Sequence, residues 1–407
     1  MTVQHTEIAI VGAGPAGLMA AIEAARGGCQ VVVLEAEATP ARKLLASGGG
    51  RCNLTNTLTV SDMAQRFGQN PRFVEAVLRR FGPDDLRRWF ADVGVETHAP
   101  DGFRVFPTTH NSSTVVDALL VEVRRLGIRL QCSWPVNGVK FGEMFLLAGP
   151  AGSMKANRVV ITVGGVGYPG LGDGRGMWSI LDALGHTIAP PVPAMVPLVT
   201  MEDWPSRCRA DTLPGVELSL AGKKKPDWTG DLIFTRSGIA GPVVLDAAGE
   251  LATRLQQQGN LDVRIRLRQG GAERWRKILA SGVGGSSGML AVEFLSGEIA
   301  SSLAVVALEE AGIEPGIKMG GLAKQRLNAL AQWLGSIPLT VTGTEGFPKA
   351  MVTRGGVAPR ELTASLESRK VPGLYLAGEV IDVDGPCGGF NLQWAFSSGY
   401  TVGWGLR

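Results

Sequence analysis

The chain has 407 residues, which suggests two or three domains at roughly 150 residues each. Hydrophobic residues make up 45% of the chain and charged residues 19%, so disorder, collagen and coiled-coil architectures are excluded. The net charge of +3 argues against a protein built to bind a nucleic-acid backbone. We interpret the one compact basic run, Lys223-Lys224-Lys225, as a solvated turn.

Five cysteines are present, and none has CxxC spacing: Cys29, Cys52, Cys132, Cys208 and Cys387. This pattern excludes a disulfide framework or a zinc ribbon and suits a reducing compartment. The apolar run over residues 8–25 has the hydropathy of a membrane segment, but it contains three glycines and Glu23 and lacks a basic leader. We therefore expect a cytoplasmic protein that makes no membrane contact.

The N-terminus predicts a βαβ unit. Residues 7–11 form an apolar run typical of a buried strand, and apolar residues from Leu18 to Ala25 follow helical spacing. Gly27-Gly28 should end this helix, and residues 31–34 form a second buried strand. The two strands of such a unit are expected to be parallel.

A GxGxxG motif lies between the first strand and the helix, at Gly12, Gly14 and Gly17. Glu35 follows the second strand. In this context the motif is typical of a dinucleotide site, where the glycines permit a tight turn and the helix N-terminus receives the pyrophosphate. Glu35 could accept hydrogen bonds from the ribose hydroxyls, and its charge would repel a 2′-phosphate.

Helices are predicted next over residues 73–81, 83–93 and 115–126, the last capped by Ser112 or Ser113. Residues 158–163 predict another strand that runs into glycines. The proline cluster at 190–193 excludes a helix or a central strand, so we place a domain crossing there.

Beyond this crossing, residues 191–248 predict short strands such as 232–235, whereas residues 250–335 predict helices, including an amphipathic one from Ala323 to Leu334. Gly282–Gly288 is predicted to be a mobile loop. Strands follow at 339–342 and 374–377. The simplest topology is a nucleotide-binding domain that is interrupted by an insertion and completed by the C-terminus.

Three further glycine segments follow predicted strands. Ser47–Asn53 is interpreted as a loop that wraps a cofactor, and Gly165–Gly170, a second GxGxxG, as a turn that shapes the same pocket. Gly378-Glu379 leads through Asp382 and Asp384 to a helix that Gly389 or Asn391 would cap. The positive end of that helix would suit a reduced flavin.

Other candidate residues are interpreted as structural. The acidic residues after Glu379 lack EF-hand spacing, and the four histidines His5, His98, His110 and His186 show no metal spacing, so no metal is expected. His110 could face substrate, and Tyr168 could donate a proton, but packing roles are favoured for both. The same holds for a redox pair of Cys52 and Cys387. The sequence does not identify a catalytic residue.

Taken together, these segments resemble the YhiN/BaiN family of FAD-dependent flavoproteins, which includes aminoacetone-oxidase-like proteins. The resemblance spans nearly the whole chain. It rests on GAGPAGLMAA at 12–21, RKLLASGGGRCNLTN at 42–56, FRVFPTTHNSSTVVDALL at 103–120, TVGGVGYPGLGDG at 162–174, LIFTRSGIAGPVVL at 232–245, VTRGGVAPREL at 352–362 and LYLAGEVIDVDGPCGGFNLQWAFSSG at 374–399. Thr162-Val163-Gly164-Gly165 departs from the usual Ala-Thr-Gly-Gly.

The resemblance implies an α/β fold, in which a Rossmann-like FAD-binding domain (1–190 and 350–407) is interrupted by a β-barrel-like insert (191–248 and 336–349) and a helical subdomain (249–335). It also implies a set of FAD contacts. These are Gly12, Ala13, Gly14, Pro15, Ala16, Gly17, Glu35, Ala36, Lys43, Ser47, Gly48, Gly49, Gly50, Arg51, Cys52, Asn53, Thr162, Gly164, Gly165, Gly378, Glu379, Asp384, Gly388, Gly389, Phe390 and Asn391.

We therefore expect an FAD-dependent oxidoreductase that transfers hydride to or from a small molecule, with NAD(P)H as one option for the reductant. Two alternatives stay open: an amine oxidase that uses O₂, and a flavin-binding protein that modifies or regulates RNA. The weak net charge speaks against nucleic acid as a partner. Neither the substrate nor the oligomeric state follows from the sequence.

Overall fold

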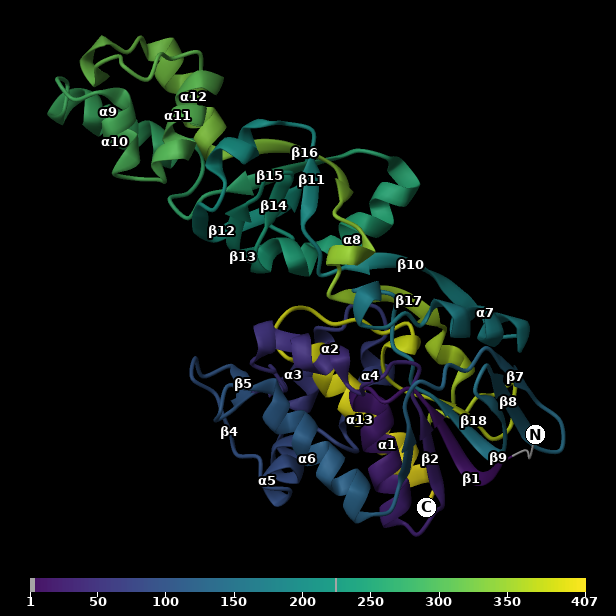
Figure 1. The fold of residues 1–407 in the computed structure, drawn as a ribbon. Coiled ribbons are helices and arrows are strands. Elements are labelled where there is room, and N and C mark those ends of the chain that lie inside the picture. Colours follow the sequence, from purple (N-terminus) through teal and green to yellow (C-terminus); the bar gives the residue numbers. More distant parts are fainter. Residues whose placement is uncertain (1–3, 224) are drawn as a thin grey trace. The chain divides into compact units, whose positions relative to one another are not determined.

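The computed structural model describes residues 4–223 and 225–407, and it divides into two compact units, Met1–Val192 with Met351–Arg407 and Pro193–Ala350 (Figure 1). Lys224, the centre of the predicted basic turn, lies outside the described residues. Among the helices of the described chain, none combines the length and the apolar character that a membrane crossing requires. The apolar run at residues 8–25 belongs to a buried strand and helix instead.

The first unit is built on a seven-stranded sheet with the order β6-β2-β1-β9-β8-β7, in which β18 also pairs with β9. Strands β6, β2, β1, β9 and β18 are mutually parallel, whereas β8 pairs antiparallel with both β9 and β7. The strand bounds are β1 Gln4–Val11, β2 Val31–Leu34, β6 Arg129–Gln131, β7 Gly138–Lys140, β8 Phe145–Gly149, β9 Gly152–Ile161 and β18 Leu374–Leu376. The predicted parallel βαβ unit is confirmed.

Helices cover this sheet, and several smaller strands join them. Their bounds are α1 Pro15–Arg26, α2 Arg42–Ala46, α3 Val60–Gln65, α4 Pro71–Leu78, α5 Pro83–Asp92, α6 Ser112–Arg125, α7 Arg175–Ala183 and α13 Phe390–Gly405, with strands β3 Thr55–Asn56, β4 Thr97–His98, β5 Arg104–Pro107, β10 Ile188–Ala194 and β17 Val352–Val357. The prediction that Ser112 or Ser113 caps α6 is wrong. Asn111 is the cap, because its side chain accepts a hydrogen bond from the Ser113 amide at 3.0 Å.

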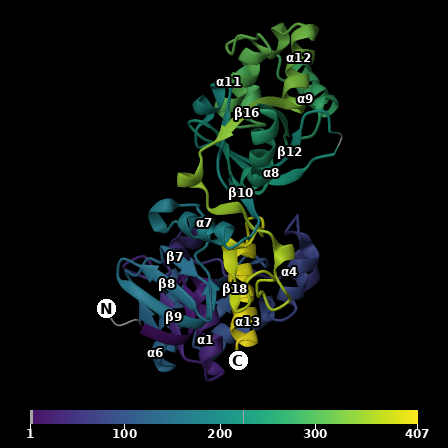
Figure 2. The same cartoon turned by 90° about the vertical axis from the view of Figure 1, so that its right-hand side faces the viewer.

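The C-terminal helix α13 packs directly along α1 (Figures 1 and 2). Glycines make this close approach possible. A Cβ atom on Gly399 would lie 2.3 Å from the carbonyl oxygen of Ala16, and one on Gly403 would lie 2.6 Å from that of Ala20. The last segment of the chain therefore completes the unit that the first segment begins, as the sequence predicts.

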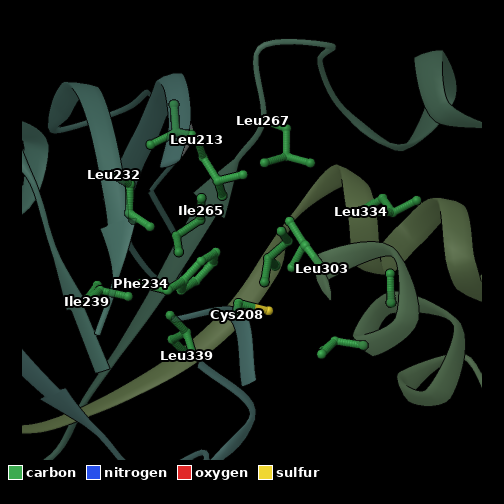
Figure 3. Close-up of a cluster of buried hydrophobic side chains, with 14 of the residues drawn as sticks. Cys208, Leu213, Leu232, Phe234, Ile239, Ile265, Leu267, Leu303, Leu334 and Leu339 are labelled. Carbon is green, nitrogen blue, oxygen red and sulfur yellow. The ribbon is translucent and has the colours of Figure 1, made fainter. Parts of the chain in front are cut away.

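The second unit contains a closed barrel of six strands in the order β11-β14-β13-β12-β15-β16, with helix α8 inserted before β15 and helices α9 to α12 between β15 and β16. The bounds are β11 Leu198–Thr200, β12 Thr212–Leu220, β13 Trp228–Phe234, β14 Gly238–Ala240, β15 Leu261–Arg266, β16 Ile337–Thr344, α8 Pro242–Gln258, α9 Ala272–Gly285, α10 Ala291–Ser296, α11 Ser301–Glu310 and α12 Lys324–Gly335. One core joins barrel and helices. Figure 3 shows Phe234 and Ile265 of the barrel close to Leu303 of α11.

Two predictions for this unit are wrong. Residues 261–266 lie in the segment predicted to be helical, but they form barrel strand β15. Leu261, Val263 and Ile265 alternate with exposed or half-exposed residues, a period of two that belongs to a strand with one buried face. Residues 282–285 are the last turn of α9 rather than a loop. Gly282 is needed there because a Cβ would lie 2.7 Å from the Phe294 ring.

The fold class is confirmed: a Rossmann-type α/β sheet is accompanied by an inserted barrel and a set of helices. The proline-rich segment forms β10, which pairs only with β17 in a two-stranded sheet. A strand with one neighbour tolerates proline, because one of its edges needs no hydrogen-bond donors. The exclusion of a central strand at 190–193 is therefore consistent with the structure.

A charged cluster, buried at His186 and Glu361 and exposed at Lys370, connects residues 361–371 to the segment after α7. His186 Nδ1 lies 3.1 Å from Glu361 Oε2, and His186 Nε2 lies 3.0 Å from Ser368 Oγ. Lys370 Nζ lies 2.8 Å from the other Glu361 oxygen. Burial opposes ionisation of Glu361, but hydrogen bonds from Lys370, Thr187 and His186 outweigh it and lower its pKa to about 2. Burial also lowers the pKa of His186, against the influence of Glu361.

We expect this cluster to make the protein sensitive to acid. Both pKa values are lower in the folded state than in the unfolded chain, so the stabilisation is complete above the unfolded His value of about 6.5 and falls as the pH drops toward about 2. At pH 7, Glu361→Gln should lose about 1.5–3 kcal/mol and show a flatter dependence of Tm on pH. Thermal melts at pH 7 and between pH 5 and pH 2 measure both effects, with exposed Glu143→Gln as the control. Parallel melting curves for the two variants would contradict the assignment.

Candidate functional site

The candidate site lies at the carboxyl edge of the parallel sheet in the first unit. Leu34, Val11, Ile161 and Leu376 end strands β2, β1, β9 and β18, and the strand register places them side by side in one row. Backbone hydrogen bonds continue the ladder by one residue, from Gly12 to Leu34, from Thr162 to Val11 and from Ala377 to Ile161, at 2.8–3.1 Å. The loops that leave these strands therefore meet at one edge, which is where α/β sheets bind ligands.

Gly14 lies at the N-terminus of α1 with its α carbon facing open space. A Cβ built on it would have no atom within 4 Å. No side chain caps the helix and its first turn contains no acid, so its N-terminal amides and positive dipole are available to an anion. This open cradle fits the pyrophosphate of a dinucleotide.

The other two glycines of the motif are required by packing within the chain. A Cβ on Gly12 would lie 2.6 Å from the carbonyl oxygen of Thr162, and one on Gly17 would lie 2.0 Å from that of Gly12. The Thr162 hydroxyl lies beneath the turn and donates to the carbonyls of Val11 and Gly12 at 2.9 and 2.8 Å. Thr162, a predicted FAD contact, thus has a structural role that the sequence did not indicate.

Glu35 closes the other end of the same cradle. Its Oε2 accepts a hydrogen bond from the amide of Ala13 at 2.7 Å, and its Oε1 accepts one from the amide of Glu37 at 2.9 Å. The carboxylate is thereby fixed beside the glycine turn. Because each carboxylate oxygen can accept more than one hydrogen bond, the two oxygens keep capacity for the ribose hydroxyls of a dinucleotide.

Glu35→Ala is expected to weaken FAD retention, because each charge-assisted hydrogen bond that is lost contributes about 1.5–3 kcal/mol. Two backbone amides also lose their partner, so the apoprotein should melt at a lower temperature. Equilibrium dialysis of FAD and thermal melts of the apoprotein separate the two effects. Glu37→Gln is the matched control, because the carboxylate of Glu37 pairs with Arg42 at 2.5 Å, whereas it is Glu35 that accepts from the glycine turn. Unchanged FAD affinity in Glu35→Ala would remove Glu35 from the site.

The glycine loop after β2 is tied to the first glycine turn. The amide of Ala41 donates to the carbonyl of Ala13 at 3.0 Å, and Lys43 Nζ donates to the carbonyl of Gly165 at 2.9 Å. Gly49 and Gly50 have φ values of +66° and +83°, and a Cβ on either would meet no atom within 4 Å. This backbone is therefore open to a ligand in the way that Gly14 is.

The same loop is joined to the start of α13. In the amide orientation that satisfies its neighbours, Asn53 donates to the carbonyls of Thr55 and Val105 and accepts from the amide of Gly389 at 3.0 Å. Asn56 donates to the carbonyl of Gly388 at 2.9 Å. The structure thus brings the predicted segments 47–53 and 388–391 together, although they are more than 300 residues apart.

Gly389, not Asn391, is the N-cap of α13. The Asn391 side chain instead accepts from the Gly385 amide and donates to the Gly385 carbonyl, both at 2.8 Å, and so closes the preceding loop. Gly389, a predicted FAD contact, also has a structural role. A Cβ there would lie 2.4 Å from the carbonyl oxygen of Thr55, so packing within the chain already requires glycine.

The second GxGxxG is held by Thr353, which the sequence did not indicate as a site residue, and by Glu379, a predicted FAD contact. Thr353 Oγ1 accepts hydrogen bonds from the amides of Val166 and Gly167 at 2.9 and 3.1 Å. Glu379 Oε1 accepts from the Thr353 amide at 2.7 Å, and a Cβ on Gly165 would lie 2.4 Å from that same oxygen. The motif therefore forms a turn packed against Glu379, and helix α7 begins only at Arg175.

Two acids lie between Glu379 and α13. Arg354 Nε and Nη2 each lie 2.9 Å from a carboxylate oxygen of Asp384. Asp382 accepts from the Gly355 amide at 2.9 Å, and burial raises the pKa of its carboxyl. The β17 motif Val352–Val357 therefore positions both acids. Thr353 and Arg354 lie within the motif at 352–362, but no spacing or residue pattern in the sequence indicates their contacts.

Cysteine and metal chemistry have little support in the described residues. Cys52 is fully buried, and burial raises the pKa of its thiol to about 12, so it is held as the unreactive thiol. Cys387 is half-buried, and both residues carry thiols rather than a disulfide. Residues 4–223 and 225–407 contain no group of three or more His, Cys, Asp and Glu side chains placed to hold a metal ion.

The cradle at Gly14, the carboxylate at Glu35 and the open glycines at 49 and 50 converge on one edge of a Rossmann-type sheet. Together with the matches below, this arrangement defines an FAD-dependent oxidoreductase. The individual FAD contacts predicted from the sequence, including Ala36, Arg51, Gly164 and Phe390, stay predictions.

Residues 6–405 match the family described as HI0933-like protein Rossmann domain, so the chain belongs to this family. It is 32% identical over 402 residues to the 3-dehydro-bile acid delta(4,6)-reductase of Clostridium scindens, covering 97% of this chain and 98% of that protein. It is also 29% identical to the ribosomal RNA dihydrouridine synthase of Haemophilus influenzae, covering 98% of each chain. The resemblance found in the sequence is thus confirmed.

Solved structures with the same fold include two that act on steroids according to their names. The 3-ketosteroid-delta4-(5alpha)-dehydrogenase of Rhodococcus jostii is similar with a TM-score of 0.53 and 17% identity, covering 99% of this chain and 97% of that one. The 3-ketosteroid delta1-dehydrogenase of Sterolibacterium denitrificans has a TM-score of 0.54 and 11% identity, covering 99% of both chains. At this identity the likeness concerns the fold alone.

Proposed function

We propose that this protein uses NAD(P)H to reduce a carbon–carbon double bond conjugated to a carbonyl group in a small molecule. The open cradle between Gly14 and Glu35 carries the flavin part of the proposal. The names of the relatives support the part of the proposal that concerns the substrate. A 3-oxo-Δ4,6 bile acid has such a double bond, and dihydrouridine differs from uridine by saturation of one.

When bound, FAD would supply the chemistry of hydride transfer between NAD(P)H and the substrate. The chain's own residues bind and orient the groups. The N-terminus of α1 and Glu35 hold the dinucleotide end, while Lys43 and Thr353 fix the backbone turn at Gly165. The clamp of Arg354 on Asp384 fixes the loop that leads to α13.

Anaerobic half-reactions test the proposal. NADPH or NADH should bleach the flavin, and a 3-oxo-Δ4,6 bile acid should then restore its visible absorption without O₂. Reduction by neither nicotinamide, together with bleaching by aminoacetone and H₂O₂ formation in air, would establish the amine oxidase alternative instead. Purified protein that neither contains nor takes up FAD would overturn the proposal altogether.

A second candidate substrate, uridine in RNA, is favoured by one feature of the barrel. Arg264, Arg266 and Arg268 alternate on the outward face of β15 and its extension, and α9 adds exposed Arg274, Arg276 and Lys277. Such a basic stripe can follow a phosphate backbone. Reoxidation of the NADPH-reduced protein by a ribosomal RNA transcript but not by the bile acid would select this candidate. Its binding should then weaken as salt rises.

A further inference from the structure

Two histidines beside the glycine loop form a direct imidazole pair. His98 Nε2 and His110 Nε2 lie 2.8 Å apart, and the rings are nearly perpendicular at 75°. At this distance one nitrogen donates and the other accepts, so the two rings adopt complementary tautomers. Across residues 4–223 and 225–407, neither Nδ1 atom has a protein hydrogen-bond partner.

Strand pairing and a strained turn hold this pair in place. His98 lies opposite Phe106 in the β4–β5 ladder. The amide of His110, in the turn that follows, donates to the Pro107 carbonyl at 2.9 Å, and the φ of +49° at His110 lies in the left-handed region that residues other than glycine rarely adopt, among which Asn, Asp and His are the most frequent. Strained backbone of this kind is concentrated at functional sites, and it is maintained here in an exposed residue.

Phe106 connects the pair to the glycine loop. Its ring lies 5.6 Å from the His110 ring and 5.4 Å from the Arg51 guanidinium, and a Cβ on Gly48 would lie 3.8 Å from it. The pair is therefore one side chain away from the backbone of Gly49 and Gly50, which is open to a ligand. Several charged groups lie on the elements around the pair. They are Arg51, Glu96, the ion pair of Asp101 with Arg104, and Arg87, whose guanidinium donates to the Thr97 hydroxyl.

We propose that His110 donates the proton that accompanies hydride transfer to the substrate, and that His98 relays a replacement proton from water. This inference rests on the proposed function. A pair bonded through Nε2 can pass a proton between its two Nδ1 atoms by exchanging tautomers, so one ring can face substrate while the other faces solvent.

The reaction balances with NAD(P)H as the source of two electrons. Hydride forms the new C–H bond at the carbon β to the carbonyl, and the electron pair of the double bond moves toward the α carbon and the carbonyl oxygen. The N–H bond of His110 breaks, and its proton forms the second C–H bond at the α carbon. Water then returns one proton through His98, and NAD(P)⁺ leaves.

His110→Asn is the sharpest variant, because asparagine tolerates the positive φ but cannot donate this proton. In the FAD-loaded protein, reoxidation by the 3-oxo-Δ4,6 bile acid should slow about 10²- to 10⁴-fold, while flavin reduction by NADPH stays within about twofold. His98→Gln should produce a smaller loss that grows with pH as proton supply becomes limiting. His5→Asn, at an exposed position at the start of β1, is the matched control.

Long-range ¹H–¹⁵N spectra give a readout that does not depend on turnover. The wild-type pair should show one protonated and one bare Nε2, and His98→Gln should remove this asymmetry at His110. Identical His110 signals in both proteins, or wild-type reoxidation of His110→Asn, would overturn the proposal. A wild-type flavin that NADPH reduces and that neither bile acid nor RNA reoxidises would instead refute the proposed function.

Discussion

Gly14→Val is expected to produce a folded protein that no longer retains FAD. The Gly14 backbone, at φ −79° and ψ −176°, is in the extended region that valine prefers, and its Cβ would meet no protein atom. The added side chain would fill only the space assigned to the pyrophosphate. We expect FAD affinity to fall at least about 100-fold, which corresponds to about 2.7 kcal/mol.

Flavin titrations and melts of the apoprotein check this expectation. The apoprotein should melt within about 1 °C of wild-type apoprotein, since surface changes usually cost less than about 0.5 kcal/mol. Gly138→Val in β7 is the matched control, because this glycine is also open and lies in a strand away from the glycine loops. Wild-type FAD affinity in Gly14→Val would show that the cofactor does not lie across α1.

Gly17→Ala is expected to have the opposite effect. It should lower the stability of the apoprotein before it weakens the retention of FAD. The new Cβ would lie 2.0 Å from the carbonyl oxygen of Gly12 and 2.5 Å from the Thr162 hydroxyl. Overpacking of this kind costs about 1–3 kcal/mol, and a clash with rigid backbone belongs at the upper end. At about 2–4 °C per kcal/mol, the apoprotein Tm should fall by roughly 6–12 °C.

Gly176→Ala in α7 supplies the control for this second variant. No atom lies within 4 Å of its built Cβ, so the substitution should be neutral or stabilise the helix by up to about 1 kcal/mol. A wild-type melting temperature in apo Gly17→Ala would mean that α1 and the turn before it are packed less tightly than the structure shows. The two variants together separate the cofactor glycine from the packing glycine within one motif.

The two glycines also show how far a motif can be interpreted from sequence. Gly12, Gly14 and Gly17 were predicted to serve one site, and the structure places all three at the carboxyl end of β1. Only the tertiary structure reveals that Gly12 and Gly17 are required for packing within the chain, because a Cβ on either would clash with atoms at or near Thr162. The same is true of Gly389, which packs on Thr55 although the sequence indicated a role toward the flavin.

Local sequence patterns were sufficient to predict a helix or a strand wherever its apolar residues follow one dominant period. The buried strand and helix at residues 4–26, helix α12 and the buried strand β18 were predicted from the spacing of apolar residues. Strand β15 was missed although Leu261, Val263 and Ile265 alternate with polar residues in the sequence, because this short run lies between helical segments and the whole of 250–335 was assigned to helices. The cap of α6 was misplaced because Asn111, Ser112 and Ser113 are all suitable caps by type, and only the backbone geometry selects one.

By itself the sequence determined the dinucleotide motif, the interruption of one domain by another and the assignment to a flavoprotein family, because each depends on residue types at short spacing or on a resemblance along the chain. Only the tertiary structure decided which distant segments share a site: Asn53 with Gly389, Thr353 with Gly167, and His98 with His110. These pairings depend on strand register and on the reach of single side chains. Such contacts leave no periodic pattern in a sequence, since either partner could equally face solvent.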